Sequence, residues 1–157
     1  MLITLNKQMH IRYISYALII IPINSRFYWK VLKIISNRMM SNISLSLDEI
    51  FILAKNVFFK NGCDEETSNI LADLVMKAER DGSLSHGLFR VPAYVAGLKN
   101  GKINGKGSPD IKIISASVVK ANGNNCLAPV VLNKSIPELI KLTKENGVAI
   151  LSITNSH

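Results

Sequence analysis

The sequence predicts an α/β protein in which a helical segment is followed by the start of a sheet-containing domain. Two amphipathic helical patterns occupy residues 46–82. An alternating apolar pattern follows Pro109, and a helical pattern then leads into the continuous apolar run 148–153. A helix followed by a buried strand is half of a β-α-β unit, and this pairing favours the α/β class over an all-helical one.

Residues 1–40 differ in composition from the rest of the 157-residue chain. No acidic residue precedes Asp48, whereas six of the 19 basic residues do, which leaves 13 basic against 11 acidic residues in the remainder. The remainder therefore carries a net charge of only +2, compared with +8 for the whole chain. A nearly neutral globular part argues against a nucleic-acid surface.

The apolar run Tyr16–Ile23 is too short for a membrane-spanning helix, which needs roughly 20 apolar residues, and it contains Pro22. No small-residue cleavage pattern follows it. We expect residues 1–40 to be a basic non-globular extension and expect no membrane partner for the rest of the chain. Three interpretations of the extension stay open: a translation start placed upstream of Met39 or Met40, a targeting segment, or a membrane-surface arm.

Cys63 and Cys126 lie far apart in the sequence, with no metal-ligand spacing and no histidine nearby. We therefore expect no metal site. Reduced thiols are typical of the cytoplasm, where we expect this protein to work.

Residues 46–82 predict a helical hairpin. Ser46-Leu47-Asp48-Glu49 has the capping-box pattern, and Gly62 is expected to end the helix that it opens. The apolar residues expected on one face of that helix are Ile50, Leu53, Val57 and Phe58. Asp64-Glu65-Glu66 place negative charge at the start of a second helix, which Gly82 ends. The stripe expected to be buried in that helix is Ile70, Leu71, Leu74, Val75 and Ala78.

The residues from Ser85 to Arg90 lie at the entrance of a third helix, because Pro92 favours a helix start nearby. His86 can exchange a proton near neutral pH, and the Ser85 hydroxyl can orient a substrate oxygen. About one turn further on, Arg90 offers a planar fork for a carboxylate, and Tyr94 follows on nearly the same face. On the residues alone, purely structural roles also stay open. Ser85 can be an N-cap and His86 a core or surface histidine, while Arg90 can be a solvated helix charge and Tyr94 a core aromatic.

The glycine-rich stretch 101–107 does not match the dinucleotide-binding fingerprint, because its spacing is wrong and no strand precedes it. We expect a solvated loop there, and this loop ends the helical segment 41–109.

Residues 110–157 predict the start of an α/β domain that is incomplete. Ile111, Ile113 and Ser115 begin an alternating strand that is expected to run to a turn at Asn122-Gly123. A second capping-box pattern at residues 135–138 is expected to open a helix, and Gly147 to close it. The run 148–153 is expected to form a buried parallel strand, with Thr154-Asn155-Ser156-His157 at the carboxyl end, where α/β proteins place ligands. Since no crossover helix follows, we interpret the chain as a truncated product.

At the site residues the sequence resembles a known family. Residues 78–92, with Ser85-His86-Gly87 and Arg90, resemble the Ser-His-Gly-x-x-Arg signature of the malate/L-lactate dehydrogenase family. Tyr94, Gly101 and Pro109 fall where that family's pattern has them, and residues 145–156 resemble its approach to an Asn-Ser-x-His motif. The resemblance extends from about Ser46 to His157.

The resemblance implies a mixed-sheet α/β fold that is not of the Rossmann type. It also implies hydride transfer between NAD or NADP and a small 2-oxo or 2-hydroxy acid, or a cyclic imine such as piperideine-2-carboxylate. His86 takes the position of a proton donor or acceptor, Ser85, Arg90 and Tyr94 those of substrate-binding residues, and Asn155 and Ser156 match the second motif. The histidine of that motif would follow His157, so which histidine is the catalytic acid stays open.

Family members make most of their cofactor contacts beyond the matched part, so the resemblance assigns no cofactor-binding residue in this chain. It implies a homodimer for the complete enzyme. The alternative is a catalytically inactive fragment that acts only by association with a partner chain.

Overall fold

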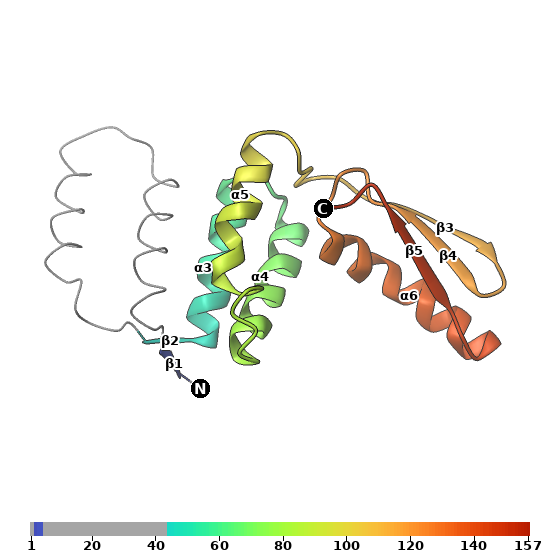
Figure 1. Ribbon diagram of the computed structural model, residues 1–157, viewed down its shortest axis with the longest axis horizontal. Helices are drawn as coiled ribbons and strands as arrows, with labels where there is room; N and C mark the ends of the chain where they lie inside the picture. The colour runs from blue at the N-terminus through green and yellow to red at the C-terminus, as the bar shows by residue number, and fades with distance from the viewer. Residues whose placement is uncertain (1, 5–43) are drawn as a thin grey trace, which may run out of the picture.

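The computed structural model describes residues 2–4 and 44–157 (Figure 1). The expectations for residues 5–43, including the apolar run and the alternative start, lie outside the described residues. Strand β1 (Leu2–Thr4) pairs antiparallel with β2 (Ser44–Ser46). A helical unit follows, and a three-stranded sheet with one helix packed along it completes the chain. The predicted α/β class is confirmed.

The helical unit contains the predicted hairpin of α3 (Leu47–Lys60) and α4 (Glu65–Arg80). The capping box forms as predicted: the Glu49 amide donates to Ser46 Oγ at 3.2 Å, and the Ser46 amide donates to Glu49 Oε2 at 2.8 Å. Asp64 caps α4 by accepting the Thr67 amide at 2.8 Å. A short 3₁₀ turn, η1 (Leu88–Arg90), then leads into α5 (Val91–Lys99).

The three helices pack around a common core. Its fully or nearly fully buried members include Ile50, Ala54, Phe58, Leu71, Val75, Val91 and Val95. The prediction that Leu53 lies on the buried face of α3 is wrong, since its side chain is 46% exposed. Ala54 is buried in its place, because the face of α3 that meets α4 follows the i, i+4, i+8 series 50, 54 and 58.

The sheet has the order β3-β4-β5, with β3 (Asp110–Ser115) antiparallel to β4 (Val118–Asn122) and β4 parallel to β5 (Ile150–Thr154). The single strand predicted to run to Asn122-Gly123 is therefore wrong: the chain reverses at residues 116–117 and forms a hairpin. Ala116-Ser117 contains no Gly, Pro, Asn or Asp, and Ser117 alone is a weak turn signal.

The parallel pairing of β5 is confirmed, but its predicted burial is wrong in the described structure. Along β5, exposed and half-buried residues alternate, and Ile150 is 58% exposed. The physical reason is that, among the described residues, α6 covers only one face of the sheet, and β5 lies at its edge with a strand on one side only.

Helix α6 (Ala128–Asn146) covers one face of this sheet (Figure 1). The start predicted at Ser135 is wrong, because the helix begins seven residues earlier and both Ser135 and Pro137 lie inside it. The Ser135 hydroxyl donates to the Val131 carbonyl at 2.8 Å, so it bonds back along the helix instead of capping its start. Gly147 ends the helix as predicted, with a left-handed φ of 79°.

The glycine-rich loop 100–109 joins the helical unit to the sheet. The Asp64 amide donates to the Gly105 carbonyl, and the Asn104 amide to the Asn125 carbonyl, at 3.1 and 2.9 Å. Gly105 is buried, and a Cβ there would lie 2.7 Å from the Gly62 carbonyl oxygen. This glycine therefore permits a close backbone contact, and a phosphate-binding role for the loop gains no support. In residues 44–157 no helix is long and apolar enough to cross a membrane.

Candidate active site on the α4–α5 loop

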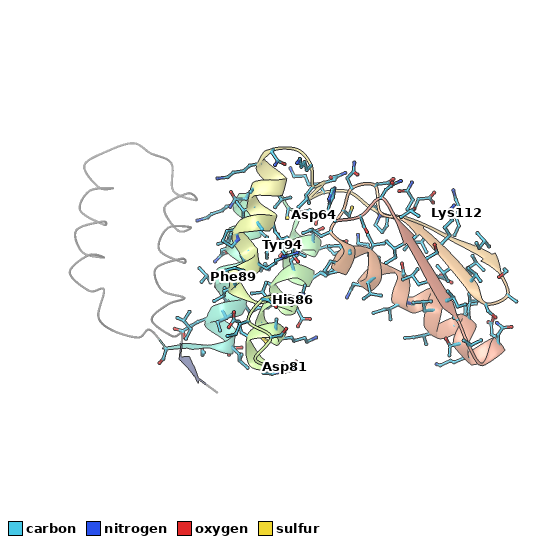
Figure 2. The ribbon with its side chains drawn as sticks, viewed as in Figure 1. Asp64, Asp81, His86, Phe89, Tyr94 and Lys112 are labelled. Carbon is cyan, nitrogen blue, oxygen red and sulfur yellow. The ribbon has the colours of Figure 1, made fainter. Side chains whose placement is uncertain are left out.

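The loop between α4 and η1 presents the predicted site residues on the surface. Gly82 ends α4 with a left-handed φ of 73°. The Ser83 amide donates to the Ala78 carbonyl, and the His86 amide donates to the Ser83 carbonyl, so the loop is a compact turn. Ser85 and His86 are both exposed on this loop, and Figure 2 labels His86.

Ser85 and His86 form a hydrogen-bonded pair, with 2.9 Å between Ser85 Oγ and His86 Nδ1. A hydroxyl can donate to an unprotonated ring nitrogen and can accept from a protonated one. This contact therefore survives when the imidazole gains or loses a proton, and Nε2 stays available for exchange with a bound molecule. The pair has the chemistry required of a proton donor or acceptor held in a defined orientation.

Arg90 and Tyr94 form the second pair. The guanidinium carbon of Arg90 lies 5.8 Å from the centre of the Tyr94 ring, which is a cation–π contact. The Tyr94 ring in turn lies 6.3 Å from the buried ring of Phe58. Among the described residues, no carboxylate forms an ion pair with Arg90. Its side chain is exposed, so its planar fork is available for an anionic ligand.

A buried carboxyl lies beneath this loop, and the sequence patterns considered above do not single it out. The Glu79 side chain is only 3% exposed, and its Oε1 accepts the Leu88 amide at 2.7 Å. Burial raises the pKa of Glu79, whereas the hydrogen bond from Leu88 acts in the opposite direction. The spacing could have revealed it, because Glu79 continues the i, i+4 series of the buried residues Leu71 and Val75.

The second predicted motif lies elsewhere. Asn155, which has a φ of 51°, donates from its side chain to Asn122 Oδ1 at 3.2 Å, and its carbonyl accepts the Asn125 amide. The carbonyl of His157 accepts the Ala128 amide at 2.7 Å, at the first turn of α6. A Cβ on Gly123 would lie 3.0 Å from the Cβ of Ser156. The motif therefore packs against the segment 122–128, which leads from β4 into α6.

The structure places the Ser85–His86 pair on the loop, and the Arg90–Tyr94 pair follows at once at the end of η1 and in α5. It does not join Asn155 and Ser156 to either pair. In the described residues no hydrogen bond links the two groups. The α4–α5 loop begins at the end of α4 that is remote from the carboxyl end of β5 (Figure 1). That Asn155 and Ser156 bind the same substrate as the loop residues stays a prediction.

A scan against protein families matches residues 45–157 to the malate/L-lactate dehydrogenase family. The chain belongs to that family. The match begins one residue before the start that the motifs indicate, and it includes both the Ser-His-Gly-x-x-Arg segment and the Asn155-Ser156 segment.

Relatives in this family include enzymes acting on cyclic imines and on hydroxy acids. The Δ1-pyrroline-2-carboxylate/Δ1-piperideine-2-carboxylate reductase of Pseudomonas syringae is 34% identical over 114 residues, which are 73% of this chain and 33% of that protein. The L-sulfolactate dehydrogenase of Methanocaldococcus jannaschii is 38% identical over 104 residues, covering 65% of this chain and 30% of that protein. The chain thus spans about a third of the length of these relatives.

Solved structures agree with this relationship. The crystal structure of the Pseudomonas syringae Δ1-piperideine-2-carboxylate reductase matches with a TM-score of 0.70 at 34% identity, over 72% of this chain and 34% of that one. The malate dehydrogenase of Pyrococcus horikoshii matches with a TM-score of 0.69 at 30% identity, over 73% and 33%.

The described part of this family member does not form a site for a dinucleotide. In the glycine-rich loop 100–109, Gly105 and Gly107 lie in close contact with neighbouring backbone and side chains, which leaves no room for a phosphate. At the start of α6, the Ala128 amide donates to the His157 carbonyl. No cluster of three metal-ligating side chains occurs in residues 44–157.

Proposed function

We propose that this chain supplies the substrate-binding and proton-transfer part of a dehydrogenase or reductase acting on a small 2-oxo or 2-hydroxy acid, or on a cyclic imine carboxylate such as piperideine-2-carboxylate. One observation carries the proposal: the hydrogen-bonded Ser85–His86 pair and an Arg90 with no ion-pair partner among the described residues lie within six residues of each other on the loop and η1. The activities of the relatives, an imine reductase and hydroxy-acid dehydrogenases, support this substrate class.

Each residue has a role that follows from its chemistry. Arg90 binds the substrate carboxylate through its planar fork, and the Tyr94 ring holds the guanidinium in place through the contact at 5.8 Å. His86 exchanges a proton with the oxygen or nitrogen at the reacting carbon, and Ser85 holds the imidazole by its bond to Nδ1. Asn155 and Ser156 are proposed as further substrate contacts on the strength of the second motif.

NAD or NADP would supply or accept the hydride when bound. Because the described residues do not fit a dinucleotide, we place no step of the reaction on it and assign no residue to its recognition. Ser85, His86 and Arg90 act on the substrate side alone. They bind its carboxylate, orient its reacting group and move one proton.

The direct test is the binding of a small carboxylate to the purified chain. Pyrrole-2-carboxylate is a planar ring with the carboxylate of the cyclic imines but no reducible bond, and pyruvate represents the 2-oxo acids. We expect Arg90→Ala to weaken the binding of either ligand at least about tenfold, because charge-assisted hydrogen bonds are lost. Nuclear magnetic resonance titration, followed in every variant at the His86 ring and at the backbone amide of residue 90, measures both dissociation constants.

Arg80→Ala is the matched control. Arg80 is also an exposed arginine near the loop, but it is already paired with Asp81 at 2.7 Å. Its loss should leave the affinity unchanged within about twofold. Equal weakening by the two substitutions, or an Arg90→Ala variant that binds as the parent does, would refute the assignment of the carboxylate site.

A second candidate is that the chain is inactive by itself and acts only in association with a partner chain. Two observations on the described residues favour it: close packing fills the glycine-rich loop, which therefore offers no room for a dinucleotide, and β5 pairs with a strand along one edge only. Hydride transfer requires close positioning of both reactants, which is worth about 7–11 kcal/mol of the barrier. NAD(P)H consumption by the purified chain, lost in His86→Ala, would exclude this candidate, whereas carboxylate binding without turnover would support it.

A further inference from the structure

Glu79 is the one acidic side chain in the helical core of the described structure, and nothing in the proposed reaction uses it. Its side chain is 3% exposed, and no cation pairs with it among residues 44–157. Its Oε2 is buried and has no hydrogen-bond partner in the described structure. A buried carboxyl with one unpartnered oxygen is costly, so it calls for an explanation in terms of the bond that it does make.

That single bond joins α4 to the middle of the candidate site. Glu79 Oε1 accepts the Leu88 amide at 2.7 Å, and Leu88 begins the turn η1. The bonded amide lies two residues after His86 and two residues before Arg90. Anchoring it therefore restrains both of these groups relative to the helical core.

Gly87 completes the contact. A Cβ built on Gly87 would overlap Glu79 Oε1 and lie 2.6 Å from the carboxyl carbon, so a side chain at this position would displace the carboxyl. Gly87 is buried although its two predecessors in the loop are exposed. Glu79 and Gly87 thus fit together, and the space left by the missing side chain is filled by the carboxyl group.

We propose that Glu79 is a positioning residue for the candidate site: its carboxyl, seated against Gly87 and bonded to the Leu88 amide, holds the loop that presents Ser85 and His86. The inference rests on the proposed function only in taking this loop as the substrate site. This role requires a hydrogen-bond acceptor on a side chain long enough to meet the Leu88 amide, but it requires no negative charge. A protonated carboxyl keeps one oxygen free to accept from an amide. The raised pKa of Glu79 agrees with this, since burial favours the neutral form.

Two substitutions of Glu79 separate the effect of side-chain length from the effect of charge. Glu79→Gln is neutral but keeps an oxygen at the same distance from α4, so the bond to Leu88 is expected to survive. Glu79→Asp keeps the carboxyl but shortens the side chain by one methylene, so its oxygen is expected to fall short of the Leu88 amide. Glu65→Gln, on the exposed side of the same helix, controls for the loss of an acidic residue.

The measurements are amide hydrogen exchange at Leu88 and the imidazole nitrogen chemical shifts of His86, both on the full chain without ligand. We expect Glu79→Asp to raise the exchange rate at Leu88 by about tenfold or more, and to shift the His86 nitrogens towards the values of a free histidine. Glu79→Gln and Glu65→Gln should stay within about twofold of the parent in exchange and keep its nitrogen shifts.

Gly87→Ala disrupts the same Glu79–Gly87 contact with Glu79 intact, and it provides a second test if Glu79→Asp does not fold. It should reproduce the effects expected of Glu79→Asp, and the double substitution should do little more than either one, because both break the same contact. Unchanged Leu88 exchange in Gly87→Ala, or a Glu79→Gln variant as perturbed as Glu79→Asp, would overturn the proposal. Since no ligand is used, this failure is separate from a failure of carboxylate binding by Arg90.

Discussion

Two adjacent phenylalanines in α3 provide a stringent test of the helical core. Phe58 is 0% exposed and packs against Tyr94, whereas Phe59 is 57% exposed. Truncation of a fully buried phenylalanine removes its transfer free energy and leaves a cavity, so we expect Phe58→Ala to lower the free energy of unfolding by about 3–5 kcal/mol. The same change at Phe59 should cost no more than about 0.5 kcal/mol, because that ring is largely in water already.

Urea unfolding followed by far-ultraviolet circular dichroism measures both values. The two variants have the same composition and differ only in which position of α3 is truncated, so helix propensity and chain length cancel in the comparison. The expected loss for Phe58→Ala is a large fraction of the roughly 5–15 kcal/mol that stabilises a typical domain, and the midpoint should fall accordingly.

A result in which Phe59→Ala costs as much as Phe58→Ala would refute the reasoning, since it would mean that the Phe59 face of α3 is also buried in solution. Phe58→Leu should be milder than Phe58→Ala, because the leucine fills part of the cavity. Loss of the Phe58 ring also removes one support of Tyr94, so Phe58→Ala should weaken carboxylate binding although it lies beneath the site.

The remaining predictions concern buried titratable groups. Because burial raises the pKa of Glu79 above its ordinary value of 4.5, its contribution to stability is complete below that pH and declines as pH rises through the folded-state pKa. Glu79→Gln should therefore gain in free energy of unfolding relative to the parent as the pH rises above 4.5, as measured by urea unfolding; a difference that does not change with pH would contradict this. Burial, together with the nearby Asp64 carboxylate, raises the pKa of Cys63 to about 12, and burial also raises the pKa of Cys126. Iodoacetamide at neutral pH should leave both thiols unmodified until the chain is unfolded, and rapid labelling of the folded chain, detected by mass spectrometry, would show that the thiols are accessible.

Features that depend on neighbours in the sequence were predicted well. The capping box at Ser46, the helix starts at Asp64 and near Pro92, and the left-handed glycines at 82 and 147 all form as expected. Each depends on contacts within about four residues, which a sequence pattern contains completely. The placement of Ser85 to Arg90 at a helix entrance belongs to the same class.

Features that depend on packing between elements were not predictable in this way. The pattern at Ser135 satisfies the local rule for a helix start, yet α6 passes through it because residues from 128 onward pack on α4 and on the sheet. The turn at residues 116–117 has only Ser117 as a weak local signal, and it exists because β4 pairs with β3 on one side and β5 on the other. Tertiary context overrides local propensity in both cases.

The sequence by itself determined the α/β class, the family, and the chemistry offered by Ser85, His86 and Arg90, because residue types and short-range spacing carry that information. Only the tertiary structure decided that Arg90 has no carboxylate partner among the described residues and that Glu79 lies under the site. It also decided that Asn155 and Ser156 lie against the segment 122–125 and make no hydrogen bond to the loop among the described residues. Those facts depend on which surfaces meet between elements distant in sequence. Burial and hydrogen-bond partners, which set the cost of a charge or an unpaired polar atom, exist only after that packing is complete.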